Sequence, residues 1–231
     1  MNKLQEKFQF LLDKYSVDTK AVIKNSEAVI IDSKEYPIFA HRSERRFIEL
    51  KNIANNGTLE GISVMRVARI AEKGTDIYKA LYREFDLCQW ILEDKLISVA
   101  VMENDNVMNV IAAMQSGIVC TIEISATLRQ GEKPIDKHEI IARCGTACDV
   151  VVDAQLRQAS IYVFGEENKK FTDVDFELYG LSAEEITIVR GAFGVAQKKN
   201  YEELLQQNAE IMKLVSMAKA SSQNGERVIM K

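Results

Sequence analysis

The chain of 231 residues, 47% of them hydrophobic, is long enough for one large domain with an appendage but short of two full domains. Its net charge of -4 comes from interspersed acidic and basic residues, which argues against nucleic acid or an anionic membrane as a partner. No stretch approaches the roughly 18 uncharged apolar residues of a membrane span, and the charged start lacks a signal-peptide core, so we expect a cytoplasmic protein.

The N-terminal segment is predicted to form a small helix and a hairpin. Apolar residues at helical spacing predict an amphipathic helix over residues 4–15. Two β-rich runs, 21–23 and 28–32, are separated by a turn-prone Asn-Ser pair and predict a hairpin. A third short strand is expected over residues 36–41.

Two helices and a strand are predicted next. Ser43 is a suitable helix cap, and residues 44–55 place apolar side chains along one helical face. Residues 62–70 are strand-like, whereas residues 76–92 again have a helical period.

The central part of the chain, up to residue 164, has an almost wholly β pattern. Apolar and polar residues alternate over 118–128, which predicts a sheet with one covered face and one more polar face. Consecutive strands without crossover helices predict antiparallel pairing, with a turn at Gly145 and Thr146. The expected strands are 97–103, 107–114, 118–128, 138–144, 149–154 and 160–164.

The last third of the sequence is predicted to be helical. Ser182 caps a helix over 183–197, and a second helix follows over 201–219. The polar run 221–225 is expected to end that helix before a short strand over 227–230. The whole pattern predicts an α+β fold, an open and mainly antiparallel β-sheet backed by helices.

The four cysteines predict neither disulfides nor a metal site. Cys88, Cys120, Cys144 and Cys148 are too scattered for a disulfide framework, so we expect small buried thiols. Cys144 and Cys148 with His138 lack a fourth ligand and the spacing of a closed zinc site, so no metal is expected. The two histidines of the chain sit in no recognisable nucleophile–base arrangement.

Four stretches, in their correct order, resemble the C-terminal half of the Gfo/Idh/MocA oxidoreductases. They are YPIFAHRSERRF (36–47), EFDLCQWILED (84–94), IIARCGTACDVVVD (140–153) and SMAKASSQNGERVIM (216–230). The resemblance covers residues 36–231 and implies the substrate and dimerisation domain of that family. Residues 1–35 are then an N-terminal helix and hairpin extension where the family has its nucleotide-binding half.

The same resemblance predicts that no cofactor binds. In the family, a Rossmann domain carries a glycine-rich loop whose backbone amides hold the pyrophosphate of the dinucleotide. No Gly-x-Gly-x-x-Gly motif occurs in this sequence, and only 35 residues precede Tyr36. We therefore expect that this chain alone does not bind NAD(P).

The resemblance also predicts no catalytic residue. Family enzymes carry an Asp-x-x-x-His pair before an Asp-Leu motif, and the histidine is the general base. A register fixed on Asp86 puts Arg83 at the histidine position and Lys79 at the aspartate position. Arginine stays protonated at any relevant pH, so it cannot accept the proton.

Basic residues are the candidate ligand-binding groups. They are Arg46, Arg66, Lys79 and Arg83, with Arg45 and Arg69 nearby. Where the resemblance implies a bound polyol, such a group would suit an anionic sugar acid or phosphate. The alternative is that these side chains are solvated or ion-paired. Their acidic partners would be Glu72, Glu84 and Asp86.

The resemblance further implies a homodimer that forms through the more polar sheet face. The interface candidates, according to the face that each presents, are Val99, Val101, Ile111, Val119, Thr121, Tyr162 and Phe164. The alternative is that the helices 182–197 and 201–219 cover that face themselves.

These expectations give a leading hypothesis and two alternatives. The leading hypothesis is a non-catalytic, dimeric binding or regulatory module for a sugar-like or anionic ligand. In the first alternative, the chain is the substrate-binding component of an NAD(P)-dependent sugar or polyol oxidoreductase whose Rossmann domain is a separate partner chain. In the second, it is a remnant that has kept only its fold.

Overall fold

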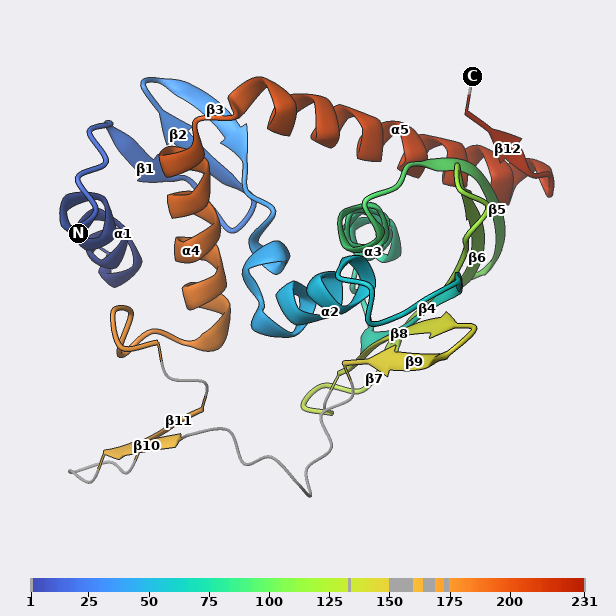
Figure 1. The fold of residues 1–231 in the computed structure, drawn as a ribbon, viewed down its shortest axis with the longest axis horizontal. Helices are drawn as coiled ribbons and strands as arrows, with labels where there is room; N and C mark the ends of the chain where they lie inside the picture. Colours follow the sequence, from blue (N-terminus) through green and yellow to red (C-terminus); the bar gives the residue numbers. More distant parts are fainter. Residues whose placement is uncertain (1, 133, 150–159, 164–168, 173–174, 231) are drawn as a thin grey trace. The chain divides into compact units, whose positions relative to one another are not determined.

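The computed structural model describes the chain except for residues 1, 133, 150–159, 164–168, 173–174 and 231 (Figure 1). The chain divides into two compact units. Unit 1 comprises Met1–Glu44 and Val151–Leu205, and unit 2 comprises Arg45–Val150 and Gln206–Lys231. The predicted division at residue 36 follows the family resemblance rather than compactness, and it stays a prediction.

The first stretch of unit 1 contains the predicted N-terminal helix and an antiparallel three-stranded sheet. The elements are α1 (Lys3–Lys14), β1 (Ala21–Ile23), β2 (Ala28–Ile31) and β3 (Lys34–Pro37). The predicted strand over 36–41 is wrong in its extent. It ends at Pro37, which has no N–H to donate, and a 3-10 turn, η1 (Ala40–Ser43), follows. It starts earlier than predicted because Asp32 and Ser33, both with positive φ, form a tight turn.

The second stretch of unit 1 adds a strand pair and a helix. β10 (Ser160–Val163) pairs antiparallel with β11 (Lys169–Thr172), which confirms the predicted strand at 160–163, whereas residue 164 lies outside the described residues. Helix α4 (Ala183–Lys198) begins as predicted at Ser182, which forms a capping box with Glu185.

Gly191 allows α4 to approach the segment around η1 closely. A Cβ atom at Gly191 would lie 2.7 Å from Ile38 Cγ2 and 3.2 Å from Ala40 Cα. We expect Gly191→Ala to lower the free energy of unfolding by about 1–3 kcal/mol in chemical denaturation, because the backbone of Ala40 cannot yield. Gly194→Ala is the matched control, since a Cβ there meets nothing within 4 Å and should raise stability by about 0.5–1 kcal/mol. Equal effects of the two substitutions would contradict this account.

Unit 2 is built on a seven-stranded sheet with the strand order β12-β5-β6-β7-β4-β8-β9. All neighbours pair antiparallel except β4 and β7, which are parallel, so the predicted α+β fold with a mainly antiparallel sheet is confirmed. The parallel pair was not predicted. It arises because helix α3 (Ile77–Leu92) follows β4, and the antiparallel run β5-β6-β7 then brings β7 beside β4 in the same direction. The strands are β4 (Ile62–Glu72), β5 (Leu96–Asn104), β6 (Val107–Met114), β7 (Val119–Leu128), β8 (Ile135–Ala142), β9 (Gly145–Cys148) and β12 (Val228–Ile229).

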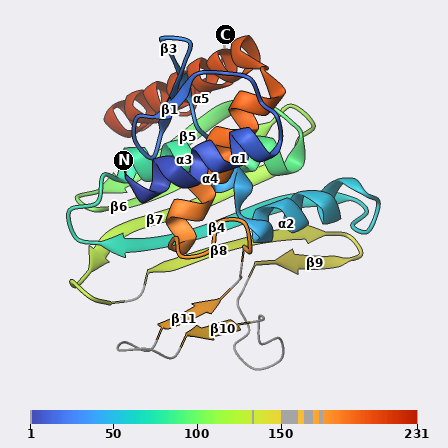
Figure 2. The same ribbon diagram turned by 90° about the vertical axis from the view of Figure 1, so that its left-hand side faces the viewer.

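One face of this sheet is covered by α3 and α2 (Arg45–Asn55), which lie on its concave side (Figure 1). The strands β7, β4 and β8 lie side by side (Figure 2). On β7, Cys120, Ile122 and Ile124 are fully buried under the helices, whereas Glu123 on the other face is exposed. The predicted alternation of this strand is therefore confirmed.

The opposite face of the sheet carries a mixture of polar and apolar side chains. Strand register places Ile111 opposite Thr121 and Met102 opposite Asn109 on this face, and Ile111 is 55% exposed. We call it the open face, because within the described residues of unit 2 its side chains are partly or largely exposed. Of the interface candidates, Ile111, Val119 and Thr121 belong to it. Val99 and Val101 lie on the covered face, and the side chains of Tyr162 and Phe164 lie outside the described residues.

The predicted turn at Gly145 and Thr146 in unit 2 is misplaced. Gly145 and Thr146 start β9 rather than forming the turn, so the hairpin closes at Arg143 and Cys144. The partner strand expected at 149–154 lies, beyond residue 149, outside the described residues.

Helix α5 (Tyr201–Asn224) continues past its predicted end at residue 219. Ser221 is compatible with the helix because its hydroxyl donates to Glu226 O and accepts from Val101 N, and the helix ends before Gly225, with φ of +69°. None of the described helices, α5 included, is both long and apolar enough to cross a membrane.

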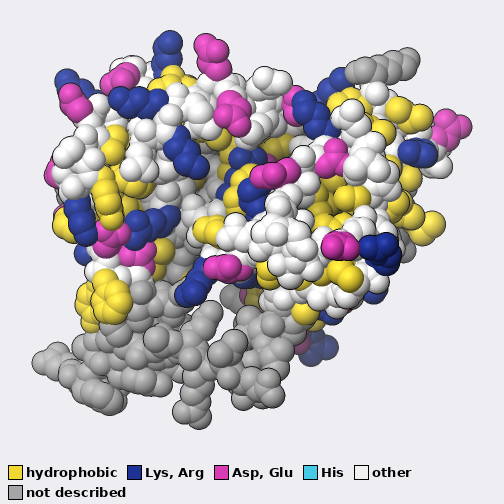
Figure 3. Space-filling model, in the orientation of Figure 1, with side chains coloured by type: hydrophobic (Ala, Val, Ile, Leu, Met, Phe, Trp, Pro, Cys, Tyr) yellow, Lys and Arg dark blue, Asp and Glu magenta, His cyan; other side chains and the backbone are white. Residues whose placement is uncertain are grey.

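Basic and acidic side chains are interspersed on the face seen in Figure 3.

Candidate functional site

The centre of the candidate site is His138, a fully buried residue on the covered face of β8. Its ring Nδ1 lies 2.9 Å from Asp149 Oδ2, and its Nε2 lies 2.8 Å from Glu84 Oε2. Its ring lies nearly perpendicular to that of Phe47, at a centroid distance of 4.7 Å and an interplanar angle of 84°. Since both ring nitrogens face carboxylates, both bonds are made when each nitrogen carries a proton, which is the imidazolium form.

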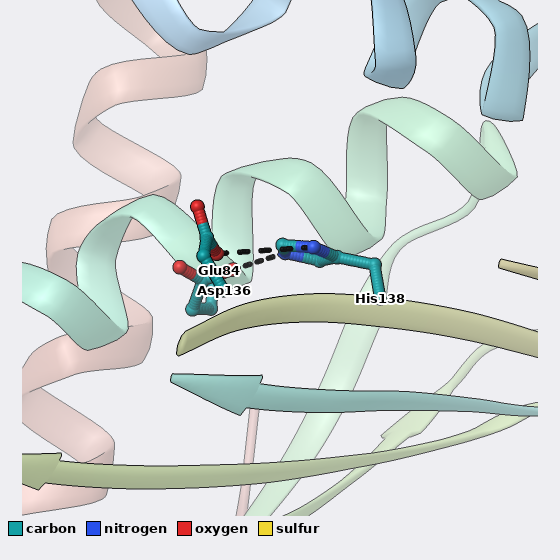
Figure 4. Close-up of side chains that lie close together, drawn as sticks. All are labelled: Glu84, Asp136 and His138. Carbon is teal, nitrogen blue, oxygen red and sulfur yellow. Dashed lines mark hydrogen bonds and ion pairs between the residues drawn. The ribbon is translucent and has the colours of Figure 1, made fainter. Parts of the chain in front are cut away.

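The two carboxylates come from different elements. Glu84 lies on α3, between Leu81 and Cys88 of the buried helical face, and points down at the sheet (Figure 4). Asp149 follows β9, and its backbone N–H donates to His138 O at 3.0 Å. The His138 N–H in turn donates to Asp149 Oδ1 at 2.6 Å. Strand β8 therefore holds the Asp149 side chain, which is 1% exposed, through backbone and side chain together.

Three arginines converge on a third carboxylate, Asp136, two residues before His138 on the same face of β8. Arg46 Nη2 lies 2.6 Å and Arg83 Nη2 3.0 Å from Asp136 Oδ2, and Arg69 Nη1 lies 3.4 Å from Oδ1. Arg83 also donates to Glu84 at 2.7 Å. The His138 network is the name used below for His138, Glu84, Asp136, Asp149, Arg46, Arg69 and Arg83.

The neighbouring charges shift three pKa values in the His138 network. Burial opposes the charged form of His138, but hydrogen bonds to Asp149 and Glu84 raise its pKa to about 9. Burial also opposes ionisation of Asp136, yet Arg83 and Arg46 hold the pKa of that carboxyl well below its usual range. In the same way, Arg83 and His138 outweigh burial and lower the pKa of Glu84. At neutral pH His138 is therefore protonated, whereas Glu84 and Asp136 are ionised.

This arrangement does not suit a metal ion. Glu84, Asp136 and His138 offer ligand atoms within 4.8 Å of one another. However, guanidinium groups occupy both carboxylates, and a protonated imidazole cannot ligate. A divalent cation would also be repelled by the three guanidinium groups and the imidazolium of the network.

The cysteines contribute nothing to this centre. Cys88 and Cys120 are buried as expected, but Cys144 and Cys148 are exposed. The expectation of burial fails there because β9 forms the last hairpin at the edge of the sheet, where burial is incomplete.

The structure brings together two of the four predicted ligand-binding residues. Arg46 and Arg83 meet at Asp136, and the neighbouring Arg69 joins them. Lys79 is exposed near the start of α3. Arg66 lies on the open face, 3.8 Å from Glu139 and 57% exposed.

Sequence reasoning did not single out Asp136, His138 or Asp149 as partners of these arginines. A signal was present at His138, because an apolar alternation over 138–144 places it on the same face as Ile140. Glu84 was named as one ion-pairing partner, and the structure pairs it with Arg83 and Arg69. Asp149 gave no such signal, because it follows β9 and reaches His138 only through the hairpin.

Comparison with solved structures shows what the fold is similar to. The chain resembles a myo-inositol dehydrogenase from Corynebacterium glutamicum (TM-score 0.61, 12% identity, 84% of this chain and 63% of that one). It is also similar to myo-inositol 2-dehydrogenase from Lactobacillus plantarum (0.57, 12%, 84% and 64%). A third similar structure is GenD2 from gentamicin A biosynthesis, in complex with NAD (0.62, 12%, 84% and 62%).

The similarity is limited to structure and to part of those enzymes. Neither a family model nor a curated protein matches the sequence. The chain spans less than two thirds of the length of the dehydrogenases that it resembles, 62% to 64% for the three above. It therefore has, over part of their length, the fold of inositol dehydrogenases of the Gfo/Idh/MocA type, as the sequence resemblance predicted.

Proposed function

We propose that this chain is a non-catalytic, dimeric binding or regulatory module related to the Gfo/Idh/MocA dehydrogenases. The observation that carries the proposal is the state of Arg83. Where the resemblance implies a general base, Arg83 is a permanent cation that donates to Glu84 at 2.7 Å and to Asp136 at 3.0 Å. A group that is already positive and ion-paired cannot accept a proton from a substrate hydroxyl.

Among the described residues, the turn from β4 to α3 does not fit the pyrophosphate of a nicotinamide dinucleotide. The turn from β4 to α3 has the strand-to-helix connection of a phosphate-binding loop, but it contains one glycine, Gly74. The first amides of α3 are satisfied by Asp76, whose carboxylate accepts from Tyr78 N and Lys79 N. A second anion at this position would be repelled by Asp76 rather than bound.

The proposed ligand is a sugar-like or anionic molecule. The support is the convergence of three arginines in the His138 network, in which Arg46 and Arg69 remain 29% and 26% exposed. Interspersed surface charge and the four free thiols support a cytoplasmic module without nucleic acid or membrane partners.

Cofactor titration of the purified chain tests the proposal. NADH and NADPH fluorescence should be unchanged by the protein, and inositols should not be oxidised in the presence of NAD or NADP. A sugar acid such as glucuronate should raise the melting temperature, whereas an uncharged inositol should raise it less. Tight NADH binding by the chain alone, or hydride transfer, would refute the proposal. Hydride transfer that requires a separate Rossmann-domain protein would favour the alternative, a substrate-binding component of a two-chain oxidoreductase.

The proposed dimer interface is the open face of the sheet. Its support is an exposed mixed surface in which Met102 is 78% and Ile111 55% exposed. Neighbouring polar side chains such as Thr121 and Glu123 supply hydrogen-bonding groups. This composition is typical of interfaces that combine apolar anchors with a polar surround.

Ile111→Lys is expected to shift the chain from dimer to monomer in analytical ultracentrifugation, because a charge would be placed at the centre of the proposed contact. Ile48→Lys is the matched control. Ile48 is 40% exposed on α2, away from the open face, and this variant should keep the wild-type mass. A monomeric wild-type protein, or equal masses for both variants, would reject the open face as the interface.

A further inference from the structure

The start of α2 and the end of the β8–β9 hairpin meet at one ion pair. The chain enters unit 2 after Glu44 and leaves it after Val150. Arg46 is the second residue after the first crossing, and Asp149 is the last but one before the second. Arg46 Nη1 lies 3.0 Å from Asp149 Oδ2, although 103 residues separate the two.

Both members of this pair are also fixed to strand β8. Asp149 exchanges backbone and side-chain hydrogen bonds with His138. Arg46 donates to the Asp136 carboxylate at 2.6 Å and to Asp136 O at 3.1 Å, and its guanidinium stacks 4.2 Å from the centre of the Phe47 ring. The start of α2 and the end of the β8–β9 hairpin therefore share one anchor.

The charge of His138 is central to this anchor. Asp149 and Asp136 face its ring from the hairpin side, and Glu84 with Arg83 faces it from α3. Arg46 from α2 and Arg69 from β4 complete the surrounding charges. Without the imidazolium proton, one of the two carboxylates that flank the ring loses one of its donors, and three carboxylates compete for three arginines.

We propose that Arg46, Asp149 and His138 form a latch, which fixes the start of α2 and the end of the β8–β9 hairpin to β8 and makes them open and close together. The protonated imidazole keeps the latch shut. Loss of its charge, or of the Asp149 charge, releases the start of α2 and the end of the hairpin in one step.

Hydrogen exchange on the full chain measures the latch directly. In Asp149→Asn, which keeps the shape of the side chain but removes its charge, amides at 45–50 and at 145–149 should both exchange about 10-fold faster or more. Glu60→Gln is the matched control. Glu60 pairs at 3.0 Å with Arg143, an exposed residue of the same hairpin. Loss of the Glu60 charge should leave the exchange rates of amides 45–50 unchanged. Faster exchange confined to 145–149 in Asp149→Asn would overturn the proposal.

Two further measurements keep the proposal testable if Asp149→Asn fails to fold. Arg46→Gln removes the charge of the other member of the ion pair. It should accelerate amide exchange in the same two segments. In the wild-type protein, exchange corrected for intrinsic rates should rise in both segments together between pH 7 and pH 10, since the pKa of His138 is raised to about 9. If the amides at the start of α2 stay protected at pH 10 while those of the hairpin exchange faster, the proposal is wrong.

Discussion

Replacement of Glu84 by alanine is expected to lower the free energy of unfolding by about 3–5 kcal/mol. Glu84 is fully buried and lies 2.7 Å from Arg83 and 2.8 Å from His138. Its removal leaves the buried His138 and the partly buried Arg83 without the carboxylate that they share. Urea denaturation followed by circular dichroism should show a midpoint far below that of the wild type, since domains have about 5–15 kcal/mol of total stability.

The exposed acid Glu60 provides the comparison for Glu84→Ala. It pairs with Arg143, and the two side chains are 68% and 77% exposed. Glu60→Ala should therefore change stability by about 0.5 kcal/mol or less. Similar denaturation midpoints for the two alanine variants would contradict this prediction, because the buried contacts of Glu84 would then contribute no more to stability than the exposed pair of Glu60.

The stability of the protein is expected to fall as the pH rises from 6.5 to about 9. The pKa of His138 is raised from 6.5 in the unfolded chain to about 9 in the folded one. Below pH 6.5 the imidazole is protonated in both states, and the stabilisation by Asp149 and Glu84 is complete. Between the two pKa values the folded state retains a proton that the unfolded state has lost, so each increase in pH favours unfolding. The loss amounts to about 3 kcal/mol over this window.

His138→Gln isolates this contribution. Glutamine retains polar atoms near Asp149 and Glu84 but does not titrate, so the variant should be less stable at pH 6 and should lack the wild-type decline toward pH 9. The measurement is the free energy of unfolding in urea at several pH values. A wild-type stability that stays constant from pH 6.5 to 9 would show that the network does not hold the proton.

Periodicity predicted most elements because burial in this fold follows local spacing. The β7 alternation is an example, since Cys120, Ile122 and Ile124 all face the helices. The capping of α4 by Ser182 was equally local. Errors occurred where a boundary depends on a distant partner. Ser221 stays in α5 because Val101, from another element, donates to its hydroxyl.

The candidate site was only partly predictable for the same reason. Arg46 and Arg83 were chosen from the resemblance, but the acids that surround them, Asp136 and Asp149, lie 90 and 103 residues from Arg46. Their meeting depends on the pairing of β4 with β8 and of β8 with β9, which brings α2 and α3 over these strands. No local pattern in the sequence carries that information.

The division of each unit between two stretches of sequence restricts the order of events on the ribosome. The first 44 residues of unit 1 are made long before α4, which packs against α1 and η1. The strands β4 to β9 emerge in between, so the central sheet has every strand except β12 before unit 1 has its second half. Because synthesis proceeds at about 5–20 residues per second, the N-terminal helix and hairpin remain without α4 for many seconds. We expect nascent chains stalled before α4 to expose the apolar side of α1 and to need chaperones.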